Sequence, residues 1–536
     1  MSLEVTSNAP NPNRAPFSEI SNQLNGSTTT IKWGQSLHSP FSAKRRRMSL
    51  CASAILHPST TARIQLNAQK RQHIAGRMVD LNIPLTMQTL ENILQVVNRE
   101  IGQTSQFNFI NPQRRNYAEY SNLPKTHVFL KPTGETNVYV KLKDMFETAE
   151  GGSKKFEKAL SMVFSAEPLP KVELVARLTA FPEAADEVLA EAKLLQQLTS
   201  EFICGVQDFA AYKNDEKCVI YAPLGDFGDL LDYFTAHIQQ FTIQERFPLV
   251  LQMFRQMSQA VKFTHDLDIV HADIKLENFF VAQQGDTFKV MLGDFGAAYG
   301  HPERLTLDEH FLGTPSYYSP EFLSYILDNI LFDNVDPQNI GKPSDMWALG
   351  CCFYTLYHDG KMPRWTSLID SIGDLLGLYN RKTKCENDEN HFDAPDTKPK
   401  PPLLMTGKEK KSYIEQSKAL EARIMQQSAT HLVHFHFQKD VPNLAKQDAE
   451  LDELQTAISD FVEKLQDFDV LDSEVIRAIK DLVNVARIKM EQAWEALDLV
   501  PAPEQSIDKL LWRMLKHNSA QRIEAKPLVD LLTRGD

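Results

Sequence analysis

The sequence lacks the marks of membrane, secreted and nucleic-acid-binding proteins. It has no apolar run of about eighteen residues, and its first residues have no basic start followed by an apolar core, so we expect no membrane span and no secretory signal. Its six cysteines form neither a Cys-x-x-Cys pair nor a zinc spacing, which favours reduced thiols in a cytoplasmic protein. The net charge of -13 argues against a partner that is nucleic acid.

The first 125 residues divide into two parts by composition. Residues 1–60 are rich in Asn, Ser, Thr and Pro without periodicity, which predicts a disordered segment. Within it, Lys44–Ser49 (Lys-Arg-Arg-Arg-Met-Ser) has three interpretations: a solvated charge run, a nuclear-import patch or a phosphorylation site at Ser49. Residues 61–125 are predicted to form a helical extension, because apolar residues recur at intervals of three and four. They are Leu90, Ile93, Leu94 and Val97.

Two short motifs carry the chemistry. The first runs from His271 to Asn278 (His-Ala-Asp-Ile-Lys-Leu-Glu-Asn), and the second is Asp294-Phe295-Gly296. Phosphoryl transfer needs a positioned hydroxyl and neutralised phosphate charge, and these residue types supply a base, a cation and oxygen ligands for Mg²⁺. We expect the segment between the motifs to fold back as a hairpin and bring them together. In order and spacing they resemble the catalytic loop and the metal-binding motif of eukaryotic-type serine/threonine protein kinases.

The resemblance implies a fold and a set of roles. The fold would be α+β and two-lobed, with a small β-rich N-lobe, a helical C-lobe and a helical insertion late in the C-lobe. Asp273 would orient the substrate hydroxyl, Lys275 would sit near the transferred phosphate, and Thr314 would hydrogen-bond both, as serine/threonine kinases require. Asn278 and Asp294 would hold Mg²⁺ across the phosphates of ATP. Further on, Asp345 would anchor the catalytic loop, and Arg522 would pair with Glu321.

The glycine-rich loop and its lysine depart from the family's pattern. The best match for the loop is Ala149–Phe156, where Gly151 is the one glycine kept in register and Lys154 stands at the third glycine position. The next strand, Lys171–Thr179, places Val175 and Arg177 where an adenine-facing alanine and a phosphate-binding lysine belong. Glu191, on the following helix, would pair with that lysine. Lys154 reaching in from the loop is similar to the with-no-lysine kinases; Lys171 or Arg177 serving in its place, and loss of activity, stay open as alternatives.

The remaining segments set the domain boundaries. The backbone from Ala222 to Leu224 resembles the hinge that reads the adenine edge, so the N-lobe would span 126–222 and the C-lobe 223–536. Residues 366–505 interrupt the C-lobe, and apolar residues spaced by three and four predict two antiparallel helices there. The insertion either stabilises the large lobe or, around 405–500, offers a platform to a partner protein.

We therefore predict an ATP- and Mg²⁺-dependent kinase that phosphorylates serine or threonine on a protein substrate. The alternative is a pseudokinase scaffold that presents its insertion to a partner. The divergent loop and the long insertion also raise the hypothesis of a bacterial effector acting in a host cytosol.

Overall fold

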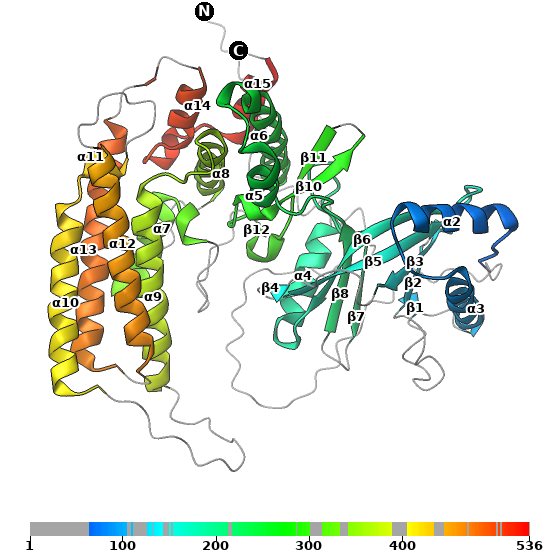
Figure 1. Ribbon diagram of the computed structural model, residues 1–536, viewed down its shortest axis with the longest axis horizontal. Coiled ribbons are helices and arrows are strands. Elements are labelled where there is room, and N and C mark those ends of the chain that lie inside the picture. The colour runs from blue at the N-terminus through cyan, green and yellow to red at the C-terminus, as the bar shows by residue number, and fades with distance from the viewer. Residues whose placement is uncertain are drawn as a thin grey trace, which may run out of the picture.

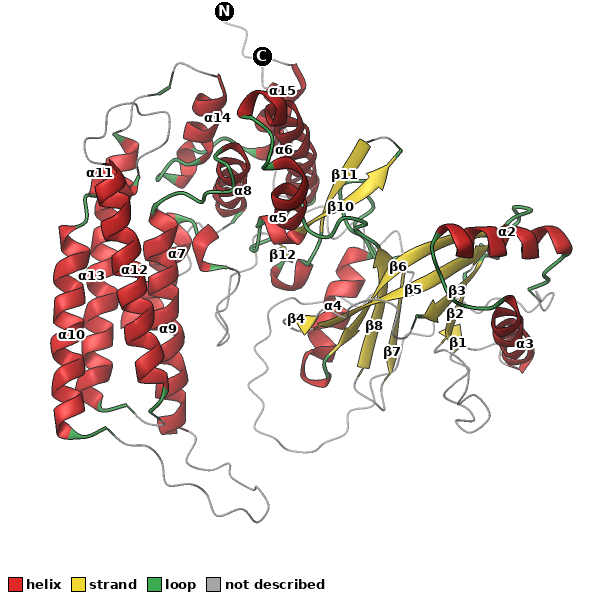
Figure 2. Cartoon of the chain, in the orientation of Figure 1, coloured by secondary structure: helices red, strands yellow, loops and turns green. Residues whose placement is uncertain are grey.

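The computed structural model describes residues 64–103, 109–110, 126–131, 133–142, 150–151, 154–212, 217–285, 287–300, 314–332, 341–387, 405–433, 444–468, 471–499, 502–503 and 506–534. The predicted disordered segment 1–60, with Lys44–Ser49, lies outside these residues. The described chain forms a β-rich lobe and a helical lobe, which confirms the predicted α+β, two-lobed fold (Figures 1 and 2).

The small lobe is built on one antiparallel sheet in the order β1-β2-β3-β5-β6-β8-β7, with β4 paired to β5. The strands are β1 (Phe109–Ile110), β2 (Thr126–Leu130), β3 (Thr136–Lys141), β4 (Glu150–Gly151), β5 (Lys154–Phe164), β6 (Lys171–Ala180), β7 (Asp208–Tyr212) and β8 (Lys217–Pro223). Apolar residues on alternate positions give each long strand two different faces.

One face of the sheet is covered by helices. Helices α2 (Ala68–Asp80) and α3 (Met87–Gln103) form a hydrophobic cluster with β2, β3 and β5, which explains the apolar spacing of the extension. Beside them, α4 (Ala185–Leu195) packs its buried residues against the same sheet and carries Glu191.

The other face curls inward and is largely polar and aromatic. The rings of Tyr139 and Tyr221 stack with their centroids 4.0 Å apart. Asp208 accepts hydrogen bonds from Asn137 at 2.7 Å and from the hydroxyl of Tyr139 at 2.8 Å. Lys131, which follows β2, forms an ion pair with Asp208 of β7. This ion pair therefore joins two strands that are far apart in the order of the sheet.

The large lobe is helical apart from a few short strands. Its helices before the insertion are α5 (Leu230–Tyr233), a single π-helical turn (Phe234–Ile238), α6 (Ile243–Asp266), α7 (Pro320–Phe332) and α8 (Lys342–Tyr357); α14 (Ser506–Met514) and α15 (Ala525–Arg534) follow it. Helix α6 begins with a capping box, in which Glu245 accepts a hydrogen bond from the backbone N–H of Thr242 at 3.0 Å. The strands are β9 (Ile269–Val270), β10 (Phe279–Gln284), β11 (Thr287–Leu292) and β12 (Tyr299–Gly300), and 3-10 turns lie at Leu276–Asn278, Phe295–Ala297, Pro315–Tyr317 and Ser519–Gln521. A further 3-10 turn, Pro182–Ala184, precedes α4 in the small lobe.

The insertion is a bundle at the end of the molecule opposite the sheet (Figure 1). Its helices are α9 (Trp365–Asn387), α10 (Gly407–Gln426), the short α11 (Ala429–Leu432), α12 (Leu444–Gln466) and α13 (Ser473–Asp498). The two predicted helices are α12 and α13. Each of them packs chiefly on α9 and α10, so they occupy diagonal positions in the bundle. None of the described helices is long and apolar enough to cross a membrane.

Candidate active site

The first motif lies in a loop that is anchored from below by α8. The carboxylate of Asp345 accepts hydrogen bonds from the backbone N–H groups of His271 and Ala272, at 2.8 and 2.9 Å. The same carboxylate contacts Nε2 of His265 on α6 at 3.0 Å. Asp345 is buried, so these contacts hold the loop in one position. The sequence predicted the role of Asp345 but did not reveal His265, whose contribution depends on the packing of α6 against α8.

Asp273 is held by three neighbouring side chains. Its Oδ1 accepts from the hydroxyl of Thr314 at 3.1 Å, and its Oδ2 lies 2.9 Å from the ammonium of Lys275. Lys275 also donates to Thr314 at 2.8 Å, which closes a three-residue ring. The amide nitrogen of Asn278 donates to Oδ2 of Asp273 at 2.9 Å and to its backbone oxygen at 2.7 Å. A carboxylate fixed in this way can orient and accept a proton from an incoming hydroxyl.

The second motif returns to the first through a hairpin. Strands β10 and β11 pair from Phe279 opposite Leu292 to the turn, as expected from the sequence. The backbone N–H of Gly293 then donates to the carbonyl of Asn278 at 2.9 Å. The ring of His271 donates to the carbonyl of Gly293 at 3.0 Å, and it packs edge-on against Phe295. Asn278 and Asp294 are thus brought to the same end of one hairpin.

Lys154 joins the two lobes at this point. Its ammonium contacts both carboxylate oxygens of Glu191, at 2.6 and 2.8 Å, and Oδ1 of Asp294 at 3.0 Å. Burial alone would lower the pKa of Lys154, but the carboxylates of Glu191 and Asp294 outweigh burial and raise it. Burial would likewise raise the pKa of Asp294, but Lys154 outweighs it and lowers that pKa. Both groups are therefore charged at neutral pH.

The structure corrects the register of β6. Within Lys171–Ala180, the residues on the side of Glu191 are the even-numbered ones, among them Ala176 and Leu178, which join the cluster that α4 covers. Leu178 lies opposite Phe156, and Ala180 lies opposite Lys154. Ala176 and Leu178 therefore stand where the adenine-facing alanine and the phosphate-binding lysine were expected.

Val175 and Arg177 lie on the opposite face. Val175 packs among the aromatic side chains of the curled sheet, and Arg177 forms a buried ion pair with Glu157. Lys171 pairs with Glu173 at 2.7 Å, and its side chain is 68% exposed. Among the three cations considered, only Lys154 contacts Glu191.

The other residues that were predicted to bind the nucleotide lie on the side of the sheet that faces α4. Gly151 lies opposite Lys154 in the short β4–β5 pairing, and the two residues between them lie outside the described ranges. Ala222 lies opposite Ala176 at the end of β8, and Leu224 packs on the same cluster. Gly151, Lys154, Ala222 and Leu224 thus belong to the side that faces α4, together with Ala176 and Leu178, which the sequence analysis missed.

The predicted metal ligands have suitable chemistry. Mg²⁺ prefers hard oxygen ligands and is commonly held by one or two carboxylates together with substrate phosphates. Asp294 offers a carboxylate whose side chain is 44% exposed, so it is open to a ligand. The nitrogen of the Asn278 amide is engaged by Asp273, which leaves the amide oxygen as the coordinating atom. Among the described residues, no cluster of three His, Cys, Asp or Glu side chains forms a metal site without a substrate.

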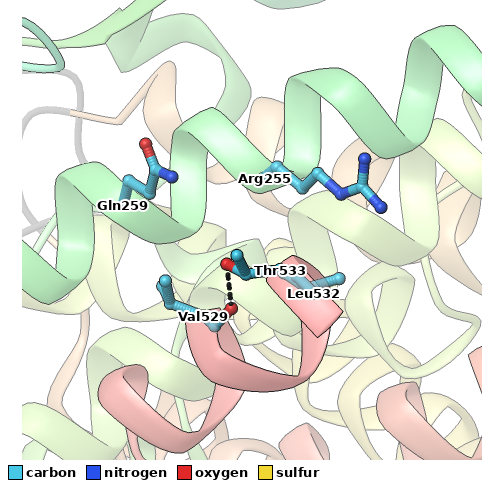
Figure 3. A pocket seen from close by; sticks show the side chains of 5 residues that line it. All are labelled: Arg255, Gln259, Val529, Leu532 and Thr533. Carbon is cyan, nitrogen blue, oxygen red and sulfur yellow. Dashed lines mark hydrogen bonds between the residues drawn. The ribbon is translucent and has the colours of Figure 1, made fainter. Parts of the chain in front are cut away.

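Within the described part of the large lobe, one hollow lies near the catalytic loop and another lies away from it. A small one of about 30 Å³ lies under the catalytic loop and includes Asp273, Thr314 and Asp345 in its lining. A larger one of about 190 Å³ lies between α6 and α15 (Figure 3). Its lining is Arg255, Gln259, Val529, Leu532 and Thr533, and the hydroxyl of Thr533 donates to the carbonyl of Val529. The lining of the larger hollow includes no carboxylate or imidazole.

Comparisons with known proteins agree with this geometry. The family model of the protein kinase domain matches residues 173–400. The chain is 32% identical to the meiosis-specific serine/threonine-protein kinase mek1 of Schizosaccharomyces pombe, over 31% of this chain and 39% of that protein. It is 28% identical to the probable serine/threonine-protein kinase nek3 of Dictyostelium discoideum, over 37% of this chain and 16% of that protein. With the testis-specific serine/threonine-protein kinase 2 of Mus musculus it shares 32% identity, over 28% of this chain and 37% of that protein.

These likenesses cover the catalytic core and leave much of each protein unmatched. The chain spans less than two fifths of the length of the relatives named above. The family match begins in β6, after the strand that carries Lys154. It includes the anchored catalytic loop, the β10–β11 hairpin and the helix that holds them. Residues 173–400 therefore match a protein kinase domain, and this part of the chain is similar to serine/threonine-protein kinases.

Proposed function

We propose that this protein transfers the γ-phosphoryl group of ATP to a serine or threonine hydroxyl of a protein substrate. The observation that carries the proposal is the ring formed by Asp273, Lys275 and Thr314. It fixes a carboxylate beside a hydroxyl and an ammonium, which is the set of groups that phosphoryl transfer to a hydroxyl needs.

In the proposed reaction, the substrate hydroxyl oxygen attacks the γ-phosphorus while the bond to the bridging oxygen of ADP breaks. The hydroxyl proton passes to Asp273, whose position is fixed by Thr314, Lys275 and Asn278. Lys275 places a positive charge beside the group in transfer. Because all four side chains are held before substrate binds, little reorganisation is needed in the transition state.

Lys154 takes the role of the missing strand lysine. Its ammonium already lies between the α4 carboxylate and Asp294, where a cation would contact the phosphates of ATP. A lysine ammonium on a flexible stem can serve from either of two neighbouring strands, because only its final position matters. When bound, Mg²⁺ would neutralise phosphate charge, and Asn278 and Asp294 would hold it.

The proposal is tested by phosphate transfer from labelled ATP to a panel of serine- and threonine-containing peptides. We expect transfer by the wild type and a loss of about 100- to 1000-fold in Asp273→Asn and in Lys154→Ala, which corresponds to removing one preorganised group. Lys171→Ala is the matched control. It removes an exposed lysine from the neighbouring strand and should leave the rate unchanged.

Three results would speak against parts of this proposal. No transfer by the wild type on any peptide would favour the pseudokinase scaffold, whose partner would bind the 405–500 insertion. An unimpaired Lys154→Ala variant would remove the assigned role of Lys154. A strong loss in Lys171→Ala would transfer that role to the rival lysine.

A further inference from the structure

The 3-10 turn Pro315–Tyr317 directly follows Thr314, the threonine of the catalytic ring. The backbone N–H of Tyr317 donates to the carbonyl of Thr314 at 3.0 Å, so the turn and the threonine move as one unit. The hydroxyl of Tyr317 lies 3.5 Å from the carboxylate of Glu277 in the catalytic loop. On this side the turn is therefore joined to the residues that surround Asp273.

The opposite side of the turn rests on α9, the first helix of the insertion bundle. The hydroxyl of Ser316 donates a hydrogen bond to Oδ1 of Asp370. One turn further along α9, a Cβ added to Gly373 would lie 2.9 Å from Cγ of Pro315, closer than real Cβ contacts allow. The absence of a side chain at Gly373 thus permits a close approach, and α9 supports the turn at two adjacent points.

Asp370 is well suited to hold the turn. Burial raises the pKa of its carboxyl group, and the hydrogen bond from Ser316 opposes that effect. If Asp370 lost the hydrogen bond from Ser316, its partly buried carboxylate would pay a desolvation cost that no other contact offsets, and this cost favours keeping the hydrogen bond. Helix α9 is itself placed by α12 and α13, which pack along it.

We infer that Asp370 is a positioning residue for phosphoryl transfer. Its contact with Ser316 holds the turn Pro315–Tyr317, and this turn sets the position of Thr314. This inference rests on the proposed function. It assigns the insertion a share in the active site, because the helix that carries Asp370 belongs to the bundle. Asp370 itself touches neither substrate nor nucleotide in this role.

The test compares steady-state kinetics of the full chain and its variants. Asp370→Ala and Ser316→Ala should each lower kcat by about tenfold, the rate equivalent of one hydrogen bond to a charged group, with the KM for ATP unchanged. The double variant should be no slower than either single variant, because both remove the same contact. Asp370→Asn keeps an acceptor oxygen and should stay within about threefold of the wild type, less than the effect of a full hydrogen bond. Gly373→Ala should lower kcat with Ser316 and Asp370 intact.

The control is Glu415→Gln, at an exposed ion pair with Lys411 on α10 of the same bundle, which should leave kcat unchanged. Equal losses in Asp370→Asn and Asp370→Ala, additive losses in the double variant, or a rise in the KM for ATP that matches the fall in kcat would each overturn the inference. Normal kcat in Asp370→Ala would do the same. A wild type that transfers no phosphate would contradict the proposed function itself, and this is measured before any variant.

Discussion

At the scale of single residues, the position of Lys154 depends on how two strands are paired. Lys154 lies opposite Ala180, and the next pair on that face is Phe156 with Leu178. Leu178 occupies the place from which a strand lysine would reach Glu191, yet it packs as an apolar residue beneath α4. Lys154 thus reaches the Glu191 carboxylate from β5, the strand beside β6. A second lysine, at position 178 of β6, would compete for the same space.

This competition predicts a rescue. In Lys154→Ala, adding Leu178→Lys should recover at least about tenfold of the lost transfer rate, because an ammonium would again lie near Glu191 and the phosphates. Leu178→Met in the same background is the control, since it has similar length without charge. Rates are measured with labelled ATP at saturating peptide. Equal rates for the Lys and Met versions would mean that charge at this point is not what Lys154 supplies.

The ion pair between Arg522 and Glu321 makes the stability of the fold depend on pH. Arg522 forms a bidentate ion pair with Glu321, at 2.6 and 2.7 Å, and the arginine side chain is only 1% exposed. Burial alone would raise the pKa of Glu321, but Arg522 outweighs it and lowers that pKa below its ordinary value. The stabilisation from this pair is therefore fully present above the unfolded-state pKa of glutamate, and it is lost as pH falls through the lower folded-state pKa.

Glu321→Gln should accordingly lower the free energy of unfolding at pH 7 by about 3 to 5 kcal/mol, because it leaves a buried guanidinium unpaired. It should also flatten the decline of stability between neutral and acidic pH. Urea unfolding at several pH values measures both effects. Glu450→Gln, at an exposed ion pair with Lys446, is the control and should change stability by less than about 1 kcal/mol. An unchanged acid profile in Glu321→Gln would assign the pH dependence to other carboxylates.

At the scale of elements, α8 holds the catalytic loop by one side chain in its first turn. Asp345 satisfies two backbone N–H groups of the loop at once. Asp345→Ala should lower kcat by about 100-fold, because the base at Asp273 loses its fixed position while nucleotide contacts from the small lobe remain. The KM for ATP should change little. Asp359→Asn, just beyond the other end of α8, removes a carboxylate that pairs with Arg246 and should leave kcat unchanged.

Elements with strong local signals were predictable, and their relative placement was less so. The catalytic loop and the β10–β11 hairpin follow from short motifs, because each depends on residues near one another in sequence. The assignment of Val175 and Arg177 failed because a one-residue shift exchanges the two faces of a strand, and the first residues of β6 do not show which face is covered. The arrangement of the helices within the bundle was also not predictable from the sequence. Apolar spacing shows which side of a helix is buried but not which helix covers it.

At the scale of the whole molecule, the bundle and the large lobe share one hydrophobic core. Buried residues of α12 and α13 belong to the same cluster as those of α6, α8 and α14. Helix α13 contacts α7 as well as α9, and Arg487 of α13 forms an ion pair with Asp328 of α7 at 3.0 Å. The insertion is therefore packed as part of the lobe that holds the catalytic loop.

A shared core predicts shared unfolding. Ile479, fully buried in α13, contributes to that core from within the insertion. Ile479→Ala should lower the free energy of unfolding by about 2 to 5 kcal/mol. The temperature at which phosphate transfer is lost should fall by as much as the midpoint temperature of unfolding. Ile488→Ala, at a 39% exposed position of the same helix, is the control and should change neither. If the insertion unfolded separately, Ile479→Ala would produce an early transition in circular dichroism while phosphate transfer persisted to the wild-type temperature. Coincident transitions are expected here, because α13 cannot leave the core without exposing the helices on which the catalytic loop rests.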